Sequence, residues 1–366
     1  MNRTTGRIIL VVLIILSGTV LNAAEKKTVQ LIGKSKFEFF PILMWDSDIG
    51  FGYGLKMFYL NPLKLNESFD VVLFNSTKGE RWYRFVFSLP DFEHRQGKNY
   101  PLAFDLVVDY DKWIKNSFFG IGNGSKFEDR EYYTREPLEI SMVFSRGFSP
   151  SLVGQVGFRY KTIRNFNFEE DSRLFNIQPS LNRSRATSAS FLINLRYDTR
   201  DRFIHPTRGL VLQGEAEFAV KSSFGNVGFS RVSSWLQYYS ILFYPKTLMA
   251  LRLGIHGLFG EDIPVQILLP IGGSQTLRGY PQDRFLGKTS ALFNVELRFP
   301  IYRRFGGVVG IDGGKVWNSL SEIDLTRWAI NPTIGLRFYM DNFLVRFDIG
   351  FGKESTGLFF NFGHIF

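Results

Sequence analysis

The chain has 366 residues, a formal net charge of +10 at pH 7 and no cysteine. Without cysteine, a disulfide framework and a thiolate metal site are both excluded. A net positive charge can indicate that a protein binds nucleic acid. Here the basic residues alternate with aromatic ones along the chain instead of clustering, so we expect no nucleic-acid binding.

The first 24 residues are predicted to be a secretory signal peptide and not part of the fold. Arg3 and Arg7 form a positive region, residues 8–16 an apolar run, and residues 21–24 a small-residue cleavage zone. A membrane anchor is the alternative, but the apolar run is too short to span a bilayer comfortably. Residues 25–36 would then form a short periplasmic N-terminal segment, too small for a folded module.

The rest of the chain contains no continuous apolar run long enough for a membrane helix. The sequence nevertheless holds 39 Phe, 15 Tyr and 6 Trp, more aromatic surface than a soluble domain normally buries. A secreted, aromatic-rich chain of this kind fits a bacterial outer-membrane barrel, whose strands alternate lipid-facing and lumen-facing residues. We therefore expect the chain in the outer membrane, in contact with its lipid and with the machinery that inserts barrels there. A soluble all-β protein is the alternative.

From residue 37 the sequence is predicted to form sixteen strands in a single domain. Written as hairpin pairs, the predicted strands are 37–45 with 49–59, 69–76 with 81–89, 102–111 with 138–148, 152–164 with 188–198, 210–220 with 229–244, 249–259 with 289–301, 307–317 with 328–340, and 343–352 with 358–366. An even number of strands lets a single chain close into a barrel with both ends on the periplasmic side. The predicted fold is thus all-β: a transmembrane antiparallel barrel over residues 37–366.

The alternation within strands predicts which side chains face the lumen. Between residues 103 and 111, Phe104 and Tyr110 share one face, and Asp105 and Asp109 share the other. The residues predicted to face the lumen are Asp105, Arg159, Asn194, Glu296, Asp312 and Asp348; those predicted to face lipid are Phe104, Phe293, Phe347 and Phe362. Lumen lining explains the acidic side chains near residue 105 better than a metal cluster does.

The predicted outer loops 112–137, 165–187 and 260–288 are longer than most of the periplasmic turns. The last of these carries Leu277-Arg278-Gly279-Tyr280 between glycines and prolines that prevent regular structure. A loop of this length inside a compact fold usually has a function or is disordered. A buried arginine would need a carboxylate partner, and Glu296 faces inward on the next strand. We therefore expect this loop to fold into the barrel.

Several motifs resemble one known family. The loop sequence GGSQTLRGYPQDRF resembles the signature of the superfamily that includes the insertase BamA, TamA and two-partner secretion transporters such as FhaC. The stretch at 195–210, LRYDTRDRFIHPTRGL, resembles the periplasmic turn of its "surface antigen" barrels. The stretches FFGIGNGS (118–125), GVVGIDGGKVW (307–317) and LFFNFGHIF (358–366) also resemble family motifs, the last its closing strand. The residues carried over are Asp198, Arg200, Asp201, Pro206, Arg208 and Gly209 in the turn, and Phe362, Gly363 and Phe366 in the closing strand.

The resemblance implies a loop lock made by Arg278, Gly279 and Tyr280 with Glu296 and Asp312. In the family the signature arginine reaches into the barrel and pairs with an acidic residue on the strand motif, which corresponds to Asp312 here. The implied function is insertion, assembly or translocation of proteins or lipids at the outer membrane. It would act through a weak seam between the first and last strands.

The sequence departs from the family in two ways. The aromatic residue expected two positions before Asp312 is Gly310, so the apolar support beneath the arginine differs. The periplasmic POTRA modules that capture polypeptides are not found before the barrel, which puts polypeptide capture in doubt. A separately encoded periplasmic partner would supply it.

Two other functions remain as alternatives. The barrel can be structural, or a narrow pore plugged by its long loop. An outer-membrane hydrolase needs a serine, a histidine and an orienting polar group. Of the four histidines, His94 and His205 lie in turns and His364 in the closing strand, which leaves His256, with Ser274 as its possible nucleophile. We read that pairing as coincidence, and expect no catalytic residues, no metal and no cofactor.

Overall fold

The computed structural model describes residues 33–46, 50–177, 184–242, 246–340 and 344–366. The predicted signal peptide and nearly all of the predicted N-terminal segment lie outside these residues. Sixteen strands form one antiparallel sheet in chain order: β1 (Lys36–Asp46), β2 (Gly50–Leu60), β3 (Ser68–Ser76), β4 (Arg81–Leu89), β5 (Tyr100–Phe118), β6 (Glu131–Ser149), β7 (Leu152–Phe166), β8 (Arg185–Asp198), β9 (Gly209–Ala219), β10 (Phe229–Ile241), β11 (Leu248–Phe259), β14 (Thr289–Tyr302), β15 (Phe305–Trp317), β16 (Ala329–Tyr339), β17 (Leu344–Phe351) and β18 (Thr356–Phe362).

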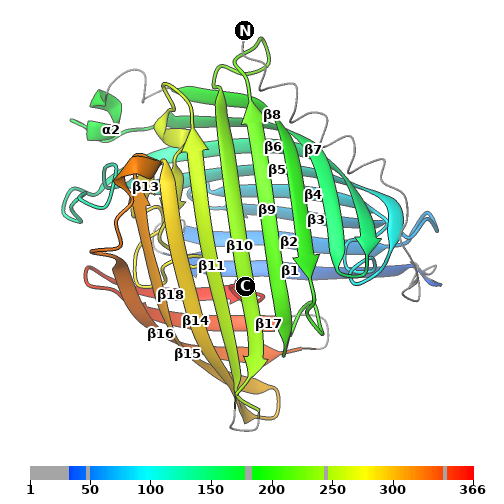
Figure 1. Ribbon diagram of the computed structural model, residues 1–366. Helices are drawn as coiled ribbons and strands as arrows, with labels where there is room; N and C mark the ends of the chain where they lie inside the picture. Colours follow the sequence, from blue (N-terminus) through cyan, green and yellow to red (C-terminus); the bar gives the residue numbers. More distant parts are fainter. Residues whose placement is uncertain (1–32, 47–49, 178–183, 243–245, 341–343) are drawn as a thin grey trace.

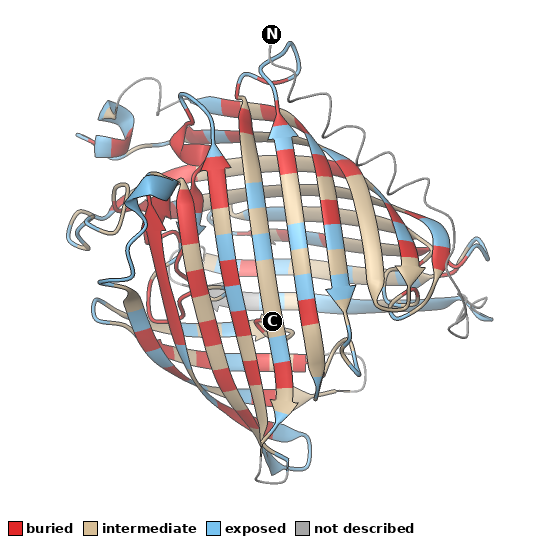
Figure 2. Ribbon diagram, viewed as in Figure 1, coloured by how far each residue is buried: buried red, intermediate tan, exposed pale blue. Residues whose placement is uncertain are grey.

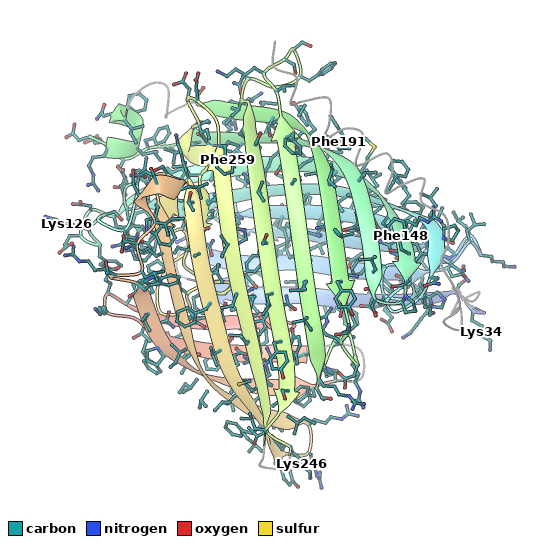
Figure 3. All side chains as sticks on the ribbon, viewed as in Figure 1. Lys34, Lys126, Phe148, Phe191, Lys246 and Phe259 are labelled. Atoms are coloured by element: carbon teal, nitrogen blue, oxygen red, sulfur yellow. The ribbon has the colours of Figure 1, made fainter. Side chains whose placement is uncertain are left out.

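The sheet wraps around on itself as a β-barrel, as predicted. Figure 1 shows β9, β10, β11 and β14 in front and β1 to β6 behind. The outer loops and the periplasmic turns lie at opposite ends, marked by Lys126 and Lys246 in Figure 3. Closure lets strands pair their backbone groups inside a membrane, where water cannot replace a missing partner. In the described part of the chain, no helix is long and apolar enough to cross a membrane.

Side chains alternate between the lumen and the lipid-facing surface along each strand. On β17, Arg346 and Asp348 are 0% exposed, whereas Phe347 between them is 39% exposed. Figure 2 shows the same alternation as bands along the front strands. Asp105 pairs with Arg95, which places it on the lumen side as predicted; the side chain of Phe362 lies outside the described part of the structure.

Two predicted boundaries are wrong. The predicted outer loop 112–137 is much shorter, because β5 continues to Phe118 and β6 already begins at Glu131. Pro137 and the polar residues around it suggested a loop. Pro137 instead lies within β6 and pairs with Ile163 of β7, two residues after Arg135, where the pairing of β6 with β5 shifts register.

The closing strand also ends earlier than predicted, at Phe362 instead of Phe366. Gly363 has a φ of +78°, a conformation that glycine adopts at low cost, and its N–H donates to the carbonyl of Leu344 at 2.8 Å. Segment 363–366 therefore leaves the sheet. Ile365 is 5% exposed, which shows that the segment turns inward.

Apolar side chains from the outer loops and the outer ends of the strands form one buried cluster. It includes Phe118, Ile163, Leu174, Phe229, Leu258, Ile263, Ile267 and Leu286. Leu174 belongs to the single-turn helix α2 (Arg173–Asn176) and Ile267 to the 3-10 turn η1 (Val265–Ile267). The outer end of the barrel is thus capped by packed hydrophobic side chains.

Candidate functional site

The connection between β11 and β14, residues 260–288, folds back into the barrel. Its short strands β12 (Leu269–Ile271) and β13 (Phe285–Gly287) pair as a hairpin. Gly272 and Gly273 follow β12 with φ values of +126° and +84°, which only glycine adopts readily. Leu277 and Tyr280, 0% and 3% exposed, join a second apolar cluster with residues of β14 and β15. These contacts hold the LRGY tip against the wall.

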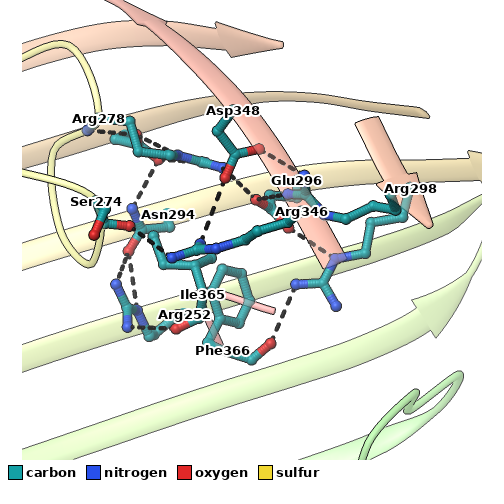
Figure 4. Close-up of polar contacts among 12 residues, drawn as sticks. Arg252, Ser274, Arg278, Asn294, Glu296, Arg298, Arg346, Asp348, Ile365 and Phe366 are labelled. Atoms are coloured by element: carbon teal, nitrogen blue, oxygen red, sulfur yellow. Dashed lines mark hydrogen bonds and ion pairs between the residues drawn. The ribbon is translucent and has the colours of Figure 1, made fainter. Parts of the chain in front are cut away.

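Arg278 lies at that tip with none of its side chain exposed. Its Nε and Nη2 donate to the two carboxylate oxygens of Asp312 at 2.9 and 2.8 Å. Its Nη1 donates to Glu296 Oε1 at 2.6 Å and lies 3.4 Å from Asp348 Oδ2. Glu296, Asp312 and Asp348 come from β14, β15 and β17; Figure 4 shows Arg278 with Glu296 and Asp348. We call Arg278, Glu296, Asp312 and Asp348 the Arg278 cluster. Such a planar two-pronged contact is specific to a guanidinium.

The carboxylates of the Arg278 cluster are themselves held in place. Asn294 Nδ2 donates to Asp312 Oδ1 at 2.8 Å, and Asn331 Nδ2 to Asp312 Oδ2 at 3.2 Å. Arg298 Nε donates to Glu296 Oε2 at 2.8 Å. All these groups come from the inward positions of adjacent strands, so the wall is preorganised to accept the loop.

Glycines allow the loop tip to approach the wall so closely. A Cβ atom on Gly350 or Gly357 would overlap the main chain of Arg278. A Cβ atom on Gly279 would lie 2.5 Å from the nitrogen of Gly352. Sequence reasoning did not single out the glycines of β17 and β18. The sequence of these two strands does not show that the loop tip packs against them. The tip therefore lies directly on the last two strands of the sheet.

Within the described part of the chain, buried arginines outnumber buried carboxylates around this site: Arg252, Arg278, Arg298, Arg337 and Arg346 surround Glu296, Asp312 and Asp348. Main-chain oxygens accept some of the hydrogen bonds that the extra guanidinium groups donate. Arg252 donates to the carbonyls of Gln275, in the loop, and Ile365, at 2.5 and 3.1 Å. Arg298 donates to the main-chain oxygen of Phe366 at 3.2 Å. Arg252 thus holds both the loop and segment 363–366, and Arg298 adds a contact to the end of that segment (Figure 4).

Segment 363–366 packs among aromatic and cationic groups in the lumen. The guanidinium groups of Arg252 and Arg298 lie 5.3 and 5.0 Å from the ring centre of Phe366. His364 lies edge-on to His205 of the periplasmic turn, at 5.8 Å between ring centres. Phe366 therefore lies in the lumen and not in the closing strand, and segment 363–366 links the loop region to the periplasmic turn.

The turn motif between β8 and β9 is closed by its own charged side chains. Arg200 donates from Nε and Nη2 to Asp198, at 3.0 and 2.7 Å. Pro206 is buried, and a Cβ atom on Gly209 would lie 2.6 Å from the carbonyl of Thr199. The spacing of the motif thus reflects a tightly packed turn.

A second acidic residue of the motif organises the end of the turn. Asp201 accepts hydrogen bonds from the N–H groups of Thr207 and Arg208, at 2.8 and 3.2 Å, and from the Thr207 hydroxyl. Slight burial would raise the pKa of Asp201, but these hydrogen bonds outweigh it and lower the pKa. Arg208 itself is exposed, so its side chain is free to meet solvent at the periplasmic face.

Another buried arginine, which sequence reasoning missed, joins three outer segments. Arg284 is 1% exposed; its Nε and Nη2 donate to Glu354, between β17 and β18, at 2.6 and 2.8 Å. Its Nη1 and Nη2 donate to the hydroxyl and carbonyl of Ser125, both at 2.7 Å. We call Arg284, Glu354 and Ser125 the outer latch. It ties the inward loop to the FFGIGNGS loop and to the last hairpin.

The candidate hydrolase residues are placed in structural contacts. His256 packs on Trp235, with ring centres 4.5 Å apart. Ser274 accepts a hydrogen bond from Arg346 through its main-chain oxygen, at 3.1 Å. Among the described residues, no hydrogen bond joins His256 to Ser274.

Comparison with known proteins supports the fold. BamA from Haemophilus ducreyi lacking POTRA domains 1–3 is similar with a TM-score of 0.64 and 16% identity, over 90% of this chain and 69% of that one. CdiB from Escherichia coli has a TM-score of 0.59 and 14% identity, over 89% and 59%; CdiB from Acinetobacter baumannii has 0.57 and 17%, over 91% and 60%. The chain thus spans about three fifths of either CdiB chain. None of the curated proteins compared with it matches.

The family is shown by its sequence model. The Omp85 superfamily domain matches residues 45–366, nearly the whole described barrel. This confirms the predicted family resemblance and agrees with the sixteen-stranded barrel. The chain is therefore an outer-membrane barrel that belongs to the Omp85 superfamily.

Proposed function

We propose that this barrel inserts, assembles or translocates polypeptides or lipids at the outer membrane, and that the Arg278 cluster is the lock that holds its inward loop. The observation that carries the proposal is the complete burial of Arg278 against three carboxylates. Separating them would leave charges unpaired in a confined site. The loop therefore has one strongly preferred position.

In this position the inward loop contacts the last two strands of the sheet. The loop tip lies on Gly350 of β17 and Gly357 of β18, and β18 is the last strand in the sheet order. Movement of the loop would thus change what supports the closing strand. A seam between β1 and β18 is the route by which a client segment would enter the membrane. The likeness in fold to BamA supports this choice.

A client also has to be captured on the periplasmic side. We assign this step to a separately encoded periplasmic partner. The face available to it lies around the turns at 90–99 and 199–208, which line a pocket of about 520 Å³.

A plugged barrel is the second candidate, and the apolar outer cap favours it. The cap buries side chains from several outer loops, and the outer latch ties those loops together. A barrel sealed in this way would serve as a structural element or a narrow gated pore.

A crosslink across the seam separates the two functions. One cysteine is introduced in β1 and one in β18, in a chain that has none of its own. The purified protein is reconstituted in liposomes, and the folding rate of an unfolded client barrel is measured. We expect the disulfide to abolish acceleration of client folding and the reduced form to retain it.

Each single-cysteine variant, treated with the same oxidant, is the control. The barrel must still migrate as a folded species on unheated gels. Full acceleration with a complete crosslink would overturn the proposal and favour the plugged barrel.

A further inference from the structure

We propose that the lipid-facing wall near the periplasmic ends of β5 to β8 binds a glycerophospholipid, with its phosphate on Arg146 and an acyl chain in an adjacent apolar groove. The groove has a volume of about 380 Å³. We call it the periplasmic groove; its lipid-facing lining is Leu102, Phe144, Phe148, Gly154, Val156 and Leu195.

The groove forms because small residues leave space between the side chains on this part of the barrel wall. Gly154 contributes no side chain, and the ring of Phe148 leans over it, 2.8 Å from where a Cβ atom would lie. Next to it, the ladder between β5 and β6 shifts register between Tyr100 and Ala103. Figure 3 shows Phe148 on this side of the barrel. A hollow of this kind on a lipid-facing surface loses dispersion contacts unless a hydrocarbon chain fills it.

Arg146 is an exposed cation at the edge of this groove. It shares the outward face of β6 with Phe144 and lies three residues from the end of the strand, roughly 10 Å along it. Its guanidinium lies 5.4 Å from the ring centre of Phe148. Among the described residues, no carboxylate forms an ion pair with it. By contrast Arg164, near the outer end of β7, pairs with Glu136 at 2.6 Å.

These observations indicate which kind of molecule would bind in the periplasmic groove. A charged side chain facing lipid is costly unless it reaches the headgroup level or finds a partner. A guanidinium fork matches two phosphate oxygens, and the groove beside it matches hydrocarbon. A glycerophospholipid of the periplasmic leaflet offers both in one molecule.

The test measures binding of dioleoyl phosphatidylglycerol to the purified protein by native mass spectrometry over a lipid titration. Arg146→Gln should weaken the first bound lipid about tenfold, the loss expected for a charged hydrogen bond. Val156→Phe keeps the arginine but fills the groove, and should weaken it as well. Arg164→Gln is the matched control, because it removes an arginine of the same wall that already has a partner.

Three results would overturn the proposal. Unchanged affinity in Arg146→Gln would show that this arginine does not bind the phosphate, and an equal loss of affinity in Arg164→Gln would make lipid binding unspecific. Displacement of the lipid by soluble glycerophosphate at equal concentration would mean that the groove contributes nothing. Migration of each variant as a heat-modifiable folded barrel shows that any loss is not a folding defect.

Discussion

Arg278 illustrates how much a single buried charge demands from its surroundings. Removing a guanidinium from water costs several kcal/mol, and only good geometry and further hydrogen bonds offset it. Here Asp312 gives both oxygens to Arg278 and is itself held by Asn294 and Asn331. The position of the loop is thus set by one side chain whose partners are all supplied by the wall.

Replacing Arg278 with alanine should release the loop. Loss of one member of a buried pair costs roughly 3–5 kcal/mol, and Glu296 and Asp348 would also lose a partner. Limited proteolysis should then cut within residues 260–288 while the barrel still resists denaturant. Arg278→Lys should rescue poorly, because an ammonium cannot make the two-pronged contact. A loop that stays protected in Arg278→Ala would remove the lock from the proposed function.

The charge exchange Arg278→Asp with Asp312→Arg should fail to restore protection. The new carboxylate at the tip would face Glu296 and Asp348, which lie 2.6 and 3.4 Å from Arg278 in the native cluster. A carboxylate on the tip would be repelled by these two carboxylates instead of attracted to them. Protease protection in the double variant should equal that of Arg278→Asp alone; clear recovery would show that Asp312 is the only partner that matters.

Gly357 should tolerate no side chain. Its Cβ atom would overlap the carbonyl oxygen of Arg278, so either the tip or β18 must move. Gly357→Ala should expose the loop to protease as Arg278→Ala does. Gly214→Ala is the control, since a Cβ atom there has no neighbour within 4 Å. Equal protection in both variants would mean that the tip does not rest on β18.

At the scale of elements, the connections differ in how they are held. In the turn between β8 and β9, the hydrogen bonds of Asp198, Arg200 and Asp201 are made to groups no more than a dozen residues away in sequence. The outer loops depend on one another, because Arg284 reaches Glu354 and Ser125, 70 and 159 residues away in sequence. A local motif can thus form alone, whereas the outer latch requires the closed barrel.

The turn motif should depend on pH through Asp201. Because its folded pKa is lowered, its stabilising contribution is present above the unfolded pKa of about 3.9 and is lost as the pH falls through the folded value. Asp201→Asn should therefore speed amide exchange in residues 199–208 at pH 7, and the difference from the unchanged protein should shrink as the pH is lowered below about 3.9. A difference that does not depend on pH would assign the effect to the shape of the side chain instead of its charge.

Breaking the outer latch should loosen the outer cap. Arg284→Gln would leave Glu354 without its two-pronged partner and Ser125 without two donors. We expect faster cleavage of the 119–130 loop by external protease and a larger conductance in planar bilayers. Glu128→Gln, an exposed change in the same loop, should alter neither. Unchanged conductance in Arg284→Gln would mean that the apolar cap closes the mouth by itself.

The whole molecule is organised by the contrast between a charged lumen and an apolar wall. Single cysteines at Phe104, Phe293 and Phe347 should react with a membrane-confined maleimide. Cysteines at Asp105 and Arg159 should not, because Arg95 and Glu217 contact those side chains in the lumen. The cysteine-free chain gives no background. Labelling of both sets would contradict the assignment of faces.

The family and the barrel could be predicted from the sequence because their signals are local. A strand with one lipid face must alternate with a period of two, so the facing of Glu296 and Asp312 follows from their own strands. The RGY tip and the periplasmic turn are contiguous motifs that can be recognised before any fold is known. The ends of β5 and β6 could not be placed, because Pro137 looks like a strand terminator in the sequence, although it pairs with Ile163 of β7 within the sheet.

The sequence by itself determined the strand number, the two faces of the barrel, the inward loop and the family. Only the tertiary structure decided that Asp348 joins Arg278, that glycines of β17 and β18 admit the tip, and that segment 363–366 turns into the lumen. The reason is physical. The alternation of apolar and polar residues can be read along a single strand. The partners of a buried charge, in contrast, come from other strands and loops, and only the closed barrel brings them within hydrogen-bonding distance.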